Sequence, residues 1–182
     1  MRFLALVLLL PALALGQGYN RSEWAHWADF DRNCLNTRQE ALVIGSLVPV
    51  QFAIGNDCLV SSGAWYDPFT GVVFTRAEQV DVDHIVPLAY AHQHGGANWS
   101  PLLKKVFAND TENLLIVSLS QNRSKGAAGP AQYLPPNQRF HCEYARLWLH
   151  LGRKYELTLA GADVLVITSL LNECRSNANE RH

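Results

Sequence analysis

The chain has 182 residues, of which 48% are hydrophobic, with 15 lysines and arginines against 16 aspartates and glutamates. This length is enough for one domain with a core of its own, and no internal repeat, low-complexity tract or interdomain linker divides it. A net charge of −1 excludes the binding of polyanions through overall charge alone.

Residues 1–16 have the composition of a secretory signal peptide. Arg2 precedes an almost unbroken apolar run, which small residues follow. The run is too short and wrongly flanked for a membrane anchor, and no later stretch is apolar enough to cross a bilayer. Cleavage after Gly16 leaves a single domain over residues 17–182, with Ala14 as the alternative cleavage position. We therefore expect a secreted protein, extracellular or periplasmic, that does not use a membrane.

Two strands and a helix are predicted in the middle of the chain. Residues 78–85 alternate apolar and polar side chains, which is typical of a strand. On such a strand His84 lies on the apolar face and Asp83 on the opposite face, so the strand must twist or end here. Residues 113–118 are a second short strand, and residues 120–125 open a helix.

Asp83, His84 and Asn122 carry the groups that metal-assisted hydrolysis needs. A carboxylate and an amide oxygen suit a hard divalent cation such as Mg²⁺, Mn²⁺ or Ca²⁺, whose other ligands would be water and substrate phosphate. A structural zinc would want cysteines or several histidines instead. Histidine titrates near neutrality, so His84 is free to act as a general base. Because phosphodiester hydrolysis needs both a base and a cation, the pattern favours that reaction.

A series of short motifs covers nearly the whole chain after the signal peptide. They are Asp29–Cys34 with Thr37 and Arg38, Asp67–Gly71, Asp83–Leu88, Trp99, Phe107–Asp110, Asn113 and Leu114, Asn122–Lys125, Pro135 and Pro136, Cys142–Tyr144, and Cys174. In this order they resemble the HNH branch of the His-Me finger (ββα-metal) nucleases. More narrowly, they resemble small secreted HNH nucleases related to the C-terminal domain of GmrSD-type restriction enzymes. An isolated Asp-His-x-x-Pro motif is weak, whereas the ordered series is specific.

The resemblance implies a role for each site residue. His84 is expected to be the general base, with Asp83 and Asn122 as the metal ligands. Asn113 fills the middle position, which in the family orients the catalytic histidine. Lys125 matches a recurrent lysine, for which a phosphate contact and a structural role are both open. The implied fold is α+β, with a ββα-metal core, an N-terminal helical extension and a C-terminal helical hairpin.

An exported chain with four cysteines is expected to form two disulfides, with three connectivities possible among Cys34, Cys58, Cys142 and Cys174. Residues 142–154 show helical spacing, which Tyr155 continues, and residues 161–174 indicate a second helix. In an antiparallel hairpin the start of the first helix meets the end of the second. This geometry pairs Cys142 with Cys174 and leaves Cys34 to pair with Cys58.

The charged residues are unevenly distributed along the chain. Residues 20–100 contain four basic and nine acidic residues, whereas residues 101–154 contain eight basic and three acidic ones. The basic segment includes Asn122, so a local positive face can hold a polyanion despite the net charge. An ordinary solvated helix surface is the alternative for Arg146, Arg153 and Lys154.

The sequence thus predicts a monomeric, secreted, metal-dependent endonuclease. Its expected substrate is DNA, cleaved without sequence specificity, and RNA is left open as a second substrate. One alternative is a catalytically silent secreted binding module on the same scaffold. The other is a zinc hydrolase using His84, His92 and His94, although no nearby cysteine or carboxylate completes a tetrahedral set.

Overall fold

The computed structural model describes residues 18–179 as a mixed α/β structure, so the expected signal peptide lies outside the described residues. The helices are α1 (Thr37–Ile44), α2 (Leu88–Gln93), α3 (Pro101–Ala108), α4 (Leu119–Lys125), α5 (His141–Lys154) and α6 (Gly161–Asn179). The strands are β1 (Gln51–Ala53), β2 (Asn56–Asp67), β3 (Val72–Arg76), β4 (Val80–His84) and β5 (Leu114–Ser118). Within residues 18–179, no helix has the length and apolar character needed to cross a membrane.

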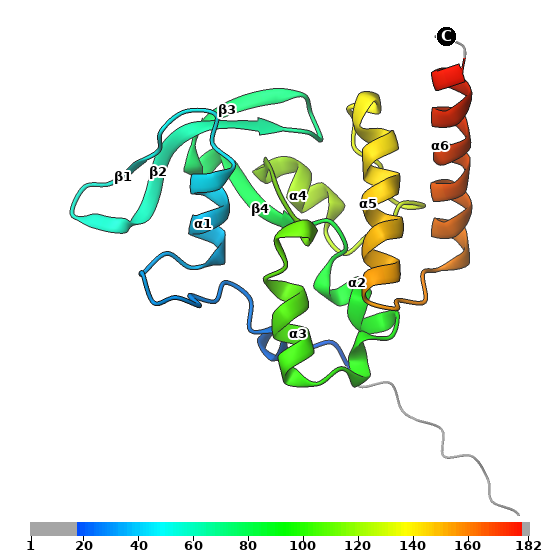
Figure 1. Ribbon diagram of the computed structural model, residues 1–182, viewed down its shortest axis with the longest axis horizontal. Coiled ribbons are helices and arrows are strands. Elements are labelled where there is room, and N and C mark those ends of the chain that lie inside the picture. The colour runs from blue at the N-terminus through cyan, green and yellow to red at the C-terminus, as the bar shows by residue number, and fades with distance from the viewer. Residues whose placement is uncertain (1–17, 180–182) are drawn as a thin grey trace, which may run out of the picture.

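A two-stranded antiparallel ribbon followed by a helix lies at the centre of the molecule (Figure 1). β4 and β5 pair in a register that places His84 opposite Leu114, and α4 begins directly after β5. α2 and α3 belong to the connection between the two strands. The elements expected at residues 78–85, 113–118 and 120–125 are confirmed within two residues at each end.

β4 is fixed in place because it joins two hydrophobic cores. Val80 and Val82 pack in a smaller core with Leu42 of α1 and Trp65 of β2. Trp65 Nε1 donates to the Leu42 carbonyl oxygen at 2.7 Å, which satisfies the buried indole. The residues just after β4 enter the main, aromatic-rich core beneath α2, α3 and α5. The end of β4 is therefore held from both sides.

Residues 51–76 form a sheet that the sequence analysis did not expect. β1, β2 and β3 pair antiparallel in that order. The expected N-terminal extension is therefore helical at α1 and at the short 3-10 turn η1 (Arg21–Trp24), but it also contains this sheet. Both strand pairs contain register shifts, and β2 includes weak strand formers such as Gly63 and Ala64. These features obscure the period of two that would reveal a strand.

Two disulfides tie the N-terminal and C-terminal segments to this framework. Cys34 bonds to Cys58 and links the loop before α1 to β2, while Cys142 bonds to Cys174 and links α5 to α6. α5 and α6 run side by side as the expected helical hairpin (Figure 1). Both predicted pairings are confirmed. Each bridge limits the freedom of the unfolded chain, which stabilises the fold by about 3 kcal/mol.

Candidate active site and metal centre

Asp83, His84 and Asn122 line one pocket of about 300 Å³ at the end of β4. Asp83 and His84 are the last two residues of that strand, and Asn122 comes from α4, which packs on both β4 and β5. Tyr19 and Arg21 of the N-terminal segment line the same pocket. The fold thus brings together the predicted base and the two predicted metal ligands.

The ring of His84 is buried and held in one orientation. Its Nε2 lies 2.8 Å from the carbonyl oxygen of Ala108 at the end of α3. The indole of Trp27 stacks on the ring, with centroids 5.5 Å apart. Because a carbonyl oxygen only accepts, Nε2 carries the proton of the neutral ring and Nδ1 keeps a lone pair. Burial lowers the pKa of His84 to about 4, so the imidazole is neutral at pH 7, as a general base must be.

Asp83 is paired with a buried lysine. Lys125 Nζ lies 2.9 Å from Asp83 Oδ2 and donates to the His84 carbonyl oxygen at 2.8 Å. Burial raises the pKa of Asp83, and the positive charge of Lys125 opposes that shift. The two charges therefore stabilise each other where little water can reach them. Lys125 itself is only 2% exposed, which favours the structural role over a phosphate contact.

The amide of Asn122 is oriented by a neighbouring acid. Its Nδ2 donates to Asp81 Oδ2 at 2.9 Å, and Arg38 Nη2 lies 3.9 Å from the other oxygen of Asp81. No residue within 18–179 donates a hydrogen bond to the Asn122 oxygen. Asp81 therefore fixes the nitrogen of the amide and leaves its oxygen available as a ligand.

Asn113 hydrogen-bonds to the backbone just after His84 and makes no hydrogen bond to the His84 ring. The fully buried Asn113 amide accepts from Val86 N at 2.9 Å and donates to Val86 O at 3.3 Å. The main-chain carbonyl oxygen of Asn113 also accepts from Ile85 N at 2.9 Å. Any influence of Asn113 on the orientation of His84 therefore passes through the backbone.

The residues of this pocket fit a hard divalent cation. The donor groups are the Asp83 carboxylate, which also pairs with Lys125, and the Asn122 amide oxygen, and both kinds of oxygen suit Mg²⁺, Mn²⁺ or Ca²⁺. In the part of the chain that the structure describes, no three His, Cys, Asp or Glu side chains gather closely enough to hold a metal. A cation here would take its remaining ligands from water and substrate.

The histidines of the zinc alternative lie in separate surroundings. His92 packs against the rings of Tyr19 and Trp24. His94 Nδ1 contacts the Thr158 carbonyl oxygen at 2.8 Å. No cluster of three potential ligands includes them within residues 18–179, so the structure does not support a zinc centre built on His84, His92 and His94.

Three contributors to the pocket were missed by sequence reasoning. Trp27 and Ala108 hold the ring of His84, and Arg21 places an exposed positive charge at the pocket. Phe107–Asp110 was noted as a motif, but a backbone carbonyl leaves no signal in residue identity. Arg21 and Trp27 come from an N-terminal segment whose sequence shows no periodicity that would direct it towards β4.

Half of the basic residues in the segment 101–154 form ion pairs with acidic residues of the protein. Lys104 pairs with Glu23, Lys125 with Asp83, Arg146 with Glu143, and Lys154 with Asp110 and Glu112. Among the described residues this leaves Lys105, Arg123, Arg139 and Arg153 without an ion-pair partner. The positive face is therefore smaller than the count along the chain indicates.

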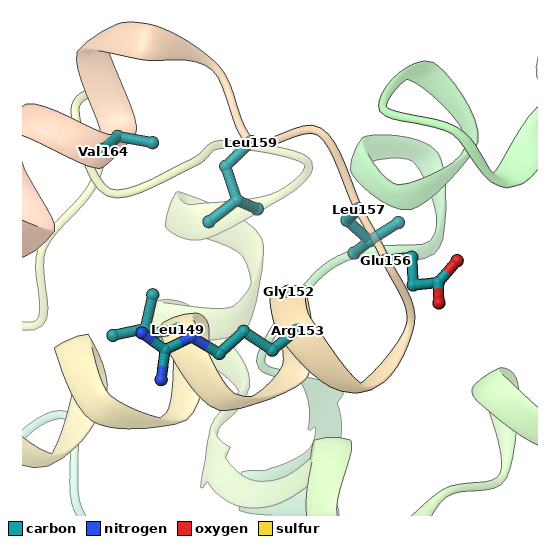
Figure 2. A pocket seen from close by; sticks show the side chains of 7 residues that line it. All are labelled: Leu149, Gly152, Arg153, Glu156, Leu157, Leu159 and Val164. Atoms are coloured by element: carbon teal, nitrogen blue, oxygen red, sulfur yellow. The ribbon is translucent and has the colours of Figure 1, made fainter.

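A second pocket lies between the end of α5 and the start of α6 (Figure 2). Its wall is formed largely by Leu149, Leu157, Leu159 and Val164. Figure 2 shows the carboxylate of Glu156 pointing away from the leucines 149 and 159. This pocket carries no arrangement of base and oxygen ligands comparable to that at the end of β4.

The fold and the site together define a disulfide-bonded α/β domain with a buried acid–histidine pair and an amide facing one pocket. The chain belongs to the family of GmrSD restriction endonuclease C-terminal domains, which are of the HNH type. The family model matches residues 55–160, more than half of the chain. The resemblance inferred from the motifs is thus confirmed.

A protein of Arthroderma benhamiae is similar to this chain over most of its length. The chain is 35% identical over 159 residues to a protein of Arthroderma benhamiae that is named an uncharacterized secreted protein. The alignment covers 86% of this chain and 76% of the fungal protein. With the two disulfides, this relative confirms the expected location outside the cytoplasm. No solved structure matches the chain.

Proposed function

We propose that the protein is a metal-dependent endonuclease that hydrolyses phosphodiester bonds of DNA without sequence specificity. The observation that carries this proposal is one pocket that holds a neutral, oriented His84 together with the carboxylate of Asp83 and the amide oxygen of Asn122. Membership of a restriction-endonuclease domain family supports a nucleic acid as substrate. On this proposal β4, β5 and α4 form the ββα-metal core of the HNH nucleases, and RNA is a second substrate to be tested.

In the proposed reaction His84 Nδ1 takes a proton from a water molecule, and the oxygen of that water attacks phosphorus. The bond from phosphorus to the 3′ oxygen breaks, the 3′ oxygen takes a proton from solvent, and a 5′-phosphate end remains. The Ala108 carbonyl accepts from Nε2 throughout, which stabilises the protonated ring that forms. Trp27 keeps the ring from turning.

Asp83 and Asn122 would hold the cation, and Lys125 favours the charged form of the buried Asp83. When bound, a divalent cation supplies positive charge against the negative charge that develops on the phosphate and the departing oxygen. Asp81 holds Asn122 in a suitable orientation by fixing its amide nitrogen.

The proposal is tested by incubating the purified mature protein with plasmid DNA and with RNA. We expect cleavage with Mg²⁺, none in EDTA, and recovery when excess Mg²⁺ or Mn²⁺ is restored. Full activity after exhaustive chelation would contradict a metal-dependent mechanism. Recovery with Zn²⁺ alone would favour a zinc hydrolase, and nucleic-acid binding without cleavage would indicate a silent binding module.

A further inference from the structure

One exposed, positively charged side chain lines the pocket that holds Asp83 and His84. Lys125 is buried and paired with Asp83, so it offers no charge to an incoming ligand. Arg21 lines the pocket and is exposed, and no carboxylate within residues 18–179 lies at ion-pair distance from it.

The short turn η1 that carries Arg21 is anchored at several points. Trp24, at its end, is fully buried in the main core. Glu23 pairs with Lys104 of α3 at 2.8 Å, and the side chain of Asn20 caps the turn. The backbone of Arg21 is therefore held at the pocket, while its side chain hydrogen-bonds to the Tyr19 side chain and stays exposed to an incoming ligand. A positive group held in this way loses less entropy when it binds.

We propose that Arg21 binds a phosphate of the nucleic-acid backbone as it enters the pocket, an inference that rests on the proposed nuclease function. A guanidinium group presents a fork of donors that matches the oxygens of a phosphate, and it stays charged at every relevant pH. His84, Asp83 and Asn122 act at the bond that breaks, but none of them is an exposed positive charge. Arg21 supplies the charge that the polyanion needs.

Arg21 also lies outside the part of the chain that matches the family model, residues 55–160. The N-terminal segment that brings it to the pocket holds Trp27 as well, whose indole stacks on His84. On this proposal the N-terminal segment completes the site, because Arg21 binds the substrate and Trp27 positions the general base His84.

The test compares binding of a fluorescent single-stranded oligonucleotide to Arg21→Gln, Arg21→Lys and Arg153→Ala, each in a His84→Ala background with Mg²⁺. Arg153 is an exposed arginine on the second pocket and serves as the matched control. We expect Arg21→Gln to weaken binding about tenfold, as for the loss of a charged hydrogen bond. The dependence of log Kd on log salt should also fall by about 0.7–1. Arg21→Lys should keep the salt dependence and lose part of the affinity, and Arg153→Ala should change neither.

Unchanged affinity and salt dependence in Arg21→Gln would overturn the inference, as would an equal loss in Arg153→Ala. Thermal unfolding of each variant checks that the exposed substitution leaves the fold intact. A protein that binds the oligonucleotide through Arg21 but, with His84 present, cleaves nothing would contradict the nuclease proposal alone. A protein that cleaves normally with Arg21→Gln, at unchanged KM, would contradict the role of Arg21 alone. A protein that neither binds nor cleaves would contradict both.

Discussion

Two lysine–carboxylate pairs of similar length lie in contrasting surroundings. Lys125 Nζ is 2.9 Å from Asp83 at the pocket, and Lys154 Nζ is 2.7 Å from Glu112 on the surface beside α5. The side chains of the first pair are 0% and 9% exposed, whereas those of the second are 35% and 54% exposed. Water competes with the exposed pair and screens it, so that pair contributes little, whereas water reaches the buried pair much less. Burial, rather than distance, decides which pair the molecule depends on.

The largest difference between the two regions is expected in the cleavage rate, when the histidine beside each ion pair is replaced. His84→Ala removes the proposed base, so the rate of plasmid cleavage should fall about 10²–10⁴-fold while Mg²⁺ binding remains. His150 contacts Glu112 at 2.8 Å on the surface, and His150→Ala should leave turnover unchanged. Cleavage kinetics and calorimetric Mg²⁺ binding measure both. An active His84→Ala protein would mean that the base lies elsewhere.

The two lysines should differ strongly in their effect on stability. Lys125→Met leaves the Asp83 carboxylate buried without a partner, which should destabilise the protein by about 3–5 kcal/mol. Lys154→Met leaves Glu112 open to water and Asp110 still hydrogen-bonded to the Tyr155 hydroxyl, so the free energy of unfolding should change much less. Urea unfolding followed by circular dichroism gives both values. Equal effects of the two substitutions would refute the importance assigned to burial.

A smaller effect, on Mg²⁺ affinity, is expected when Asn122, the proposed metal ligand on α4, is replaced. Asn122→Ala removes one oxygen ligand, so Mg²⁺ affinity should fall at least about 10–100-fold, the range found when a supporting group is lost. Part of the lost activity should return at high Mg²⁺ concentration. Asn98→Ala, at an exposed asparagine outside the pocket, is the control. Calorimetry showing wild-type Mg²⁺ affinity for Asn122→Ala would remove Asn122 from the site.

The smallest effect concerns the pH dependence of the surface pair. Hydrogen bonds from Lys154 and His150 lower the pKa of Glu112 from 4.5 to about 2. A lowered carboxyl pKa stabilises the fold above the unfolded pKa, and this contribution is lost as the pH falls through about 2. Glu112→Gln should therefore lower the thermal midpoint slightly at pH 7 and low salt, and the difference should vanish at pH 2. A difference that persists at pH 2, or in 1 M salt, would show that its origin is not electrostatic.

The local part of the site could be predicted because its signals are local. Asp83 and His84 end one strand, and Asn122 lies on the helix that follows the partner strand, so alternation and chain order suffice to bring them together. The contacts of His84 with Trp27 and Ala108 could not be predicted. They depend on the packing of the N-terminal segment and of α3 against β4, which no repeat in the sequence encodes.

Electrostatics was predicted less well than topology for a related reason. The count of basic residues in the segment 101–154 ignored partners from distant parts of the chain, such as Glu23 for Lys104. Likewise, the motif identifies Asn113 but cannot tell whether its amide contacts a ring or a backbone, and the structure shows hydrogen bonds to the backbone of Val86. Charge and hydrogen bonding depend on partners, which only the folded arrangement supplies.

The hydrogen bond from Asn122 to Asp81 also bears on how the protein can be produced. Asn122 begins an Asn-x-Ser triplet and Asn109 an Asn-x-Thr triplet, which are acceptor sequences for N-linked sugars. In the folded chain both amide nitrogens are already used, in Asn122 to reach Asp81 and in Asn109 to reach two backbone carbonyls. A sugar attached to either nitrogen would displace these bonds, and on Asn122 it would stand in the pocket itself. In a cell that glycosylates its exported proteins, only chains that escape the modification at both positions can form the complete site.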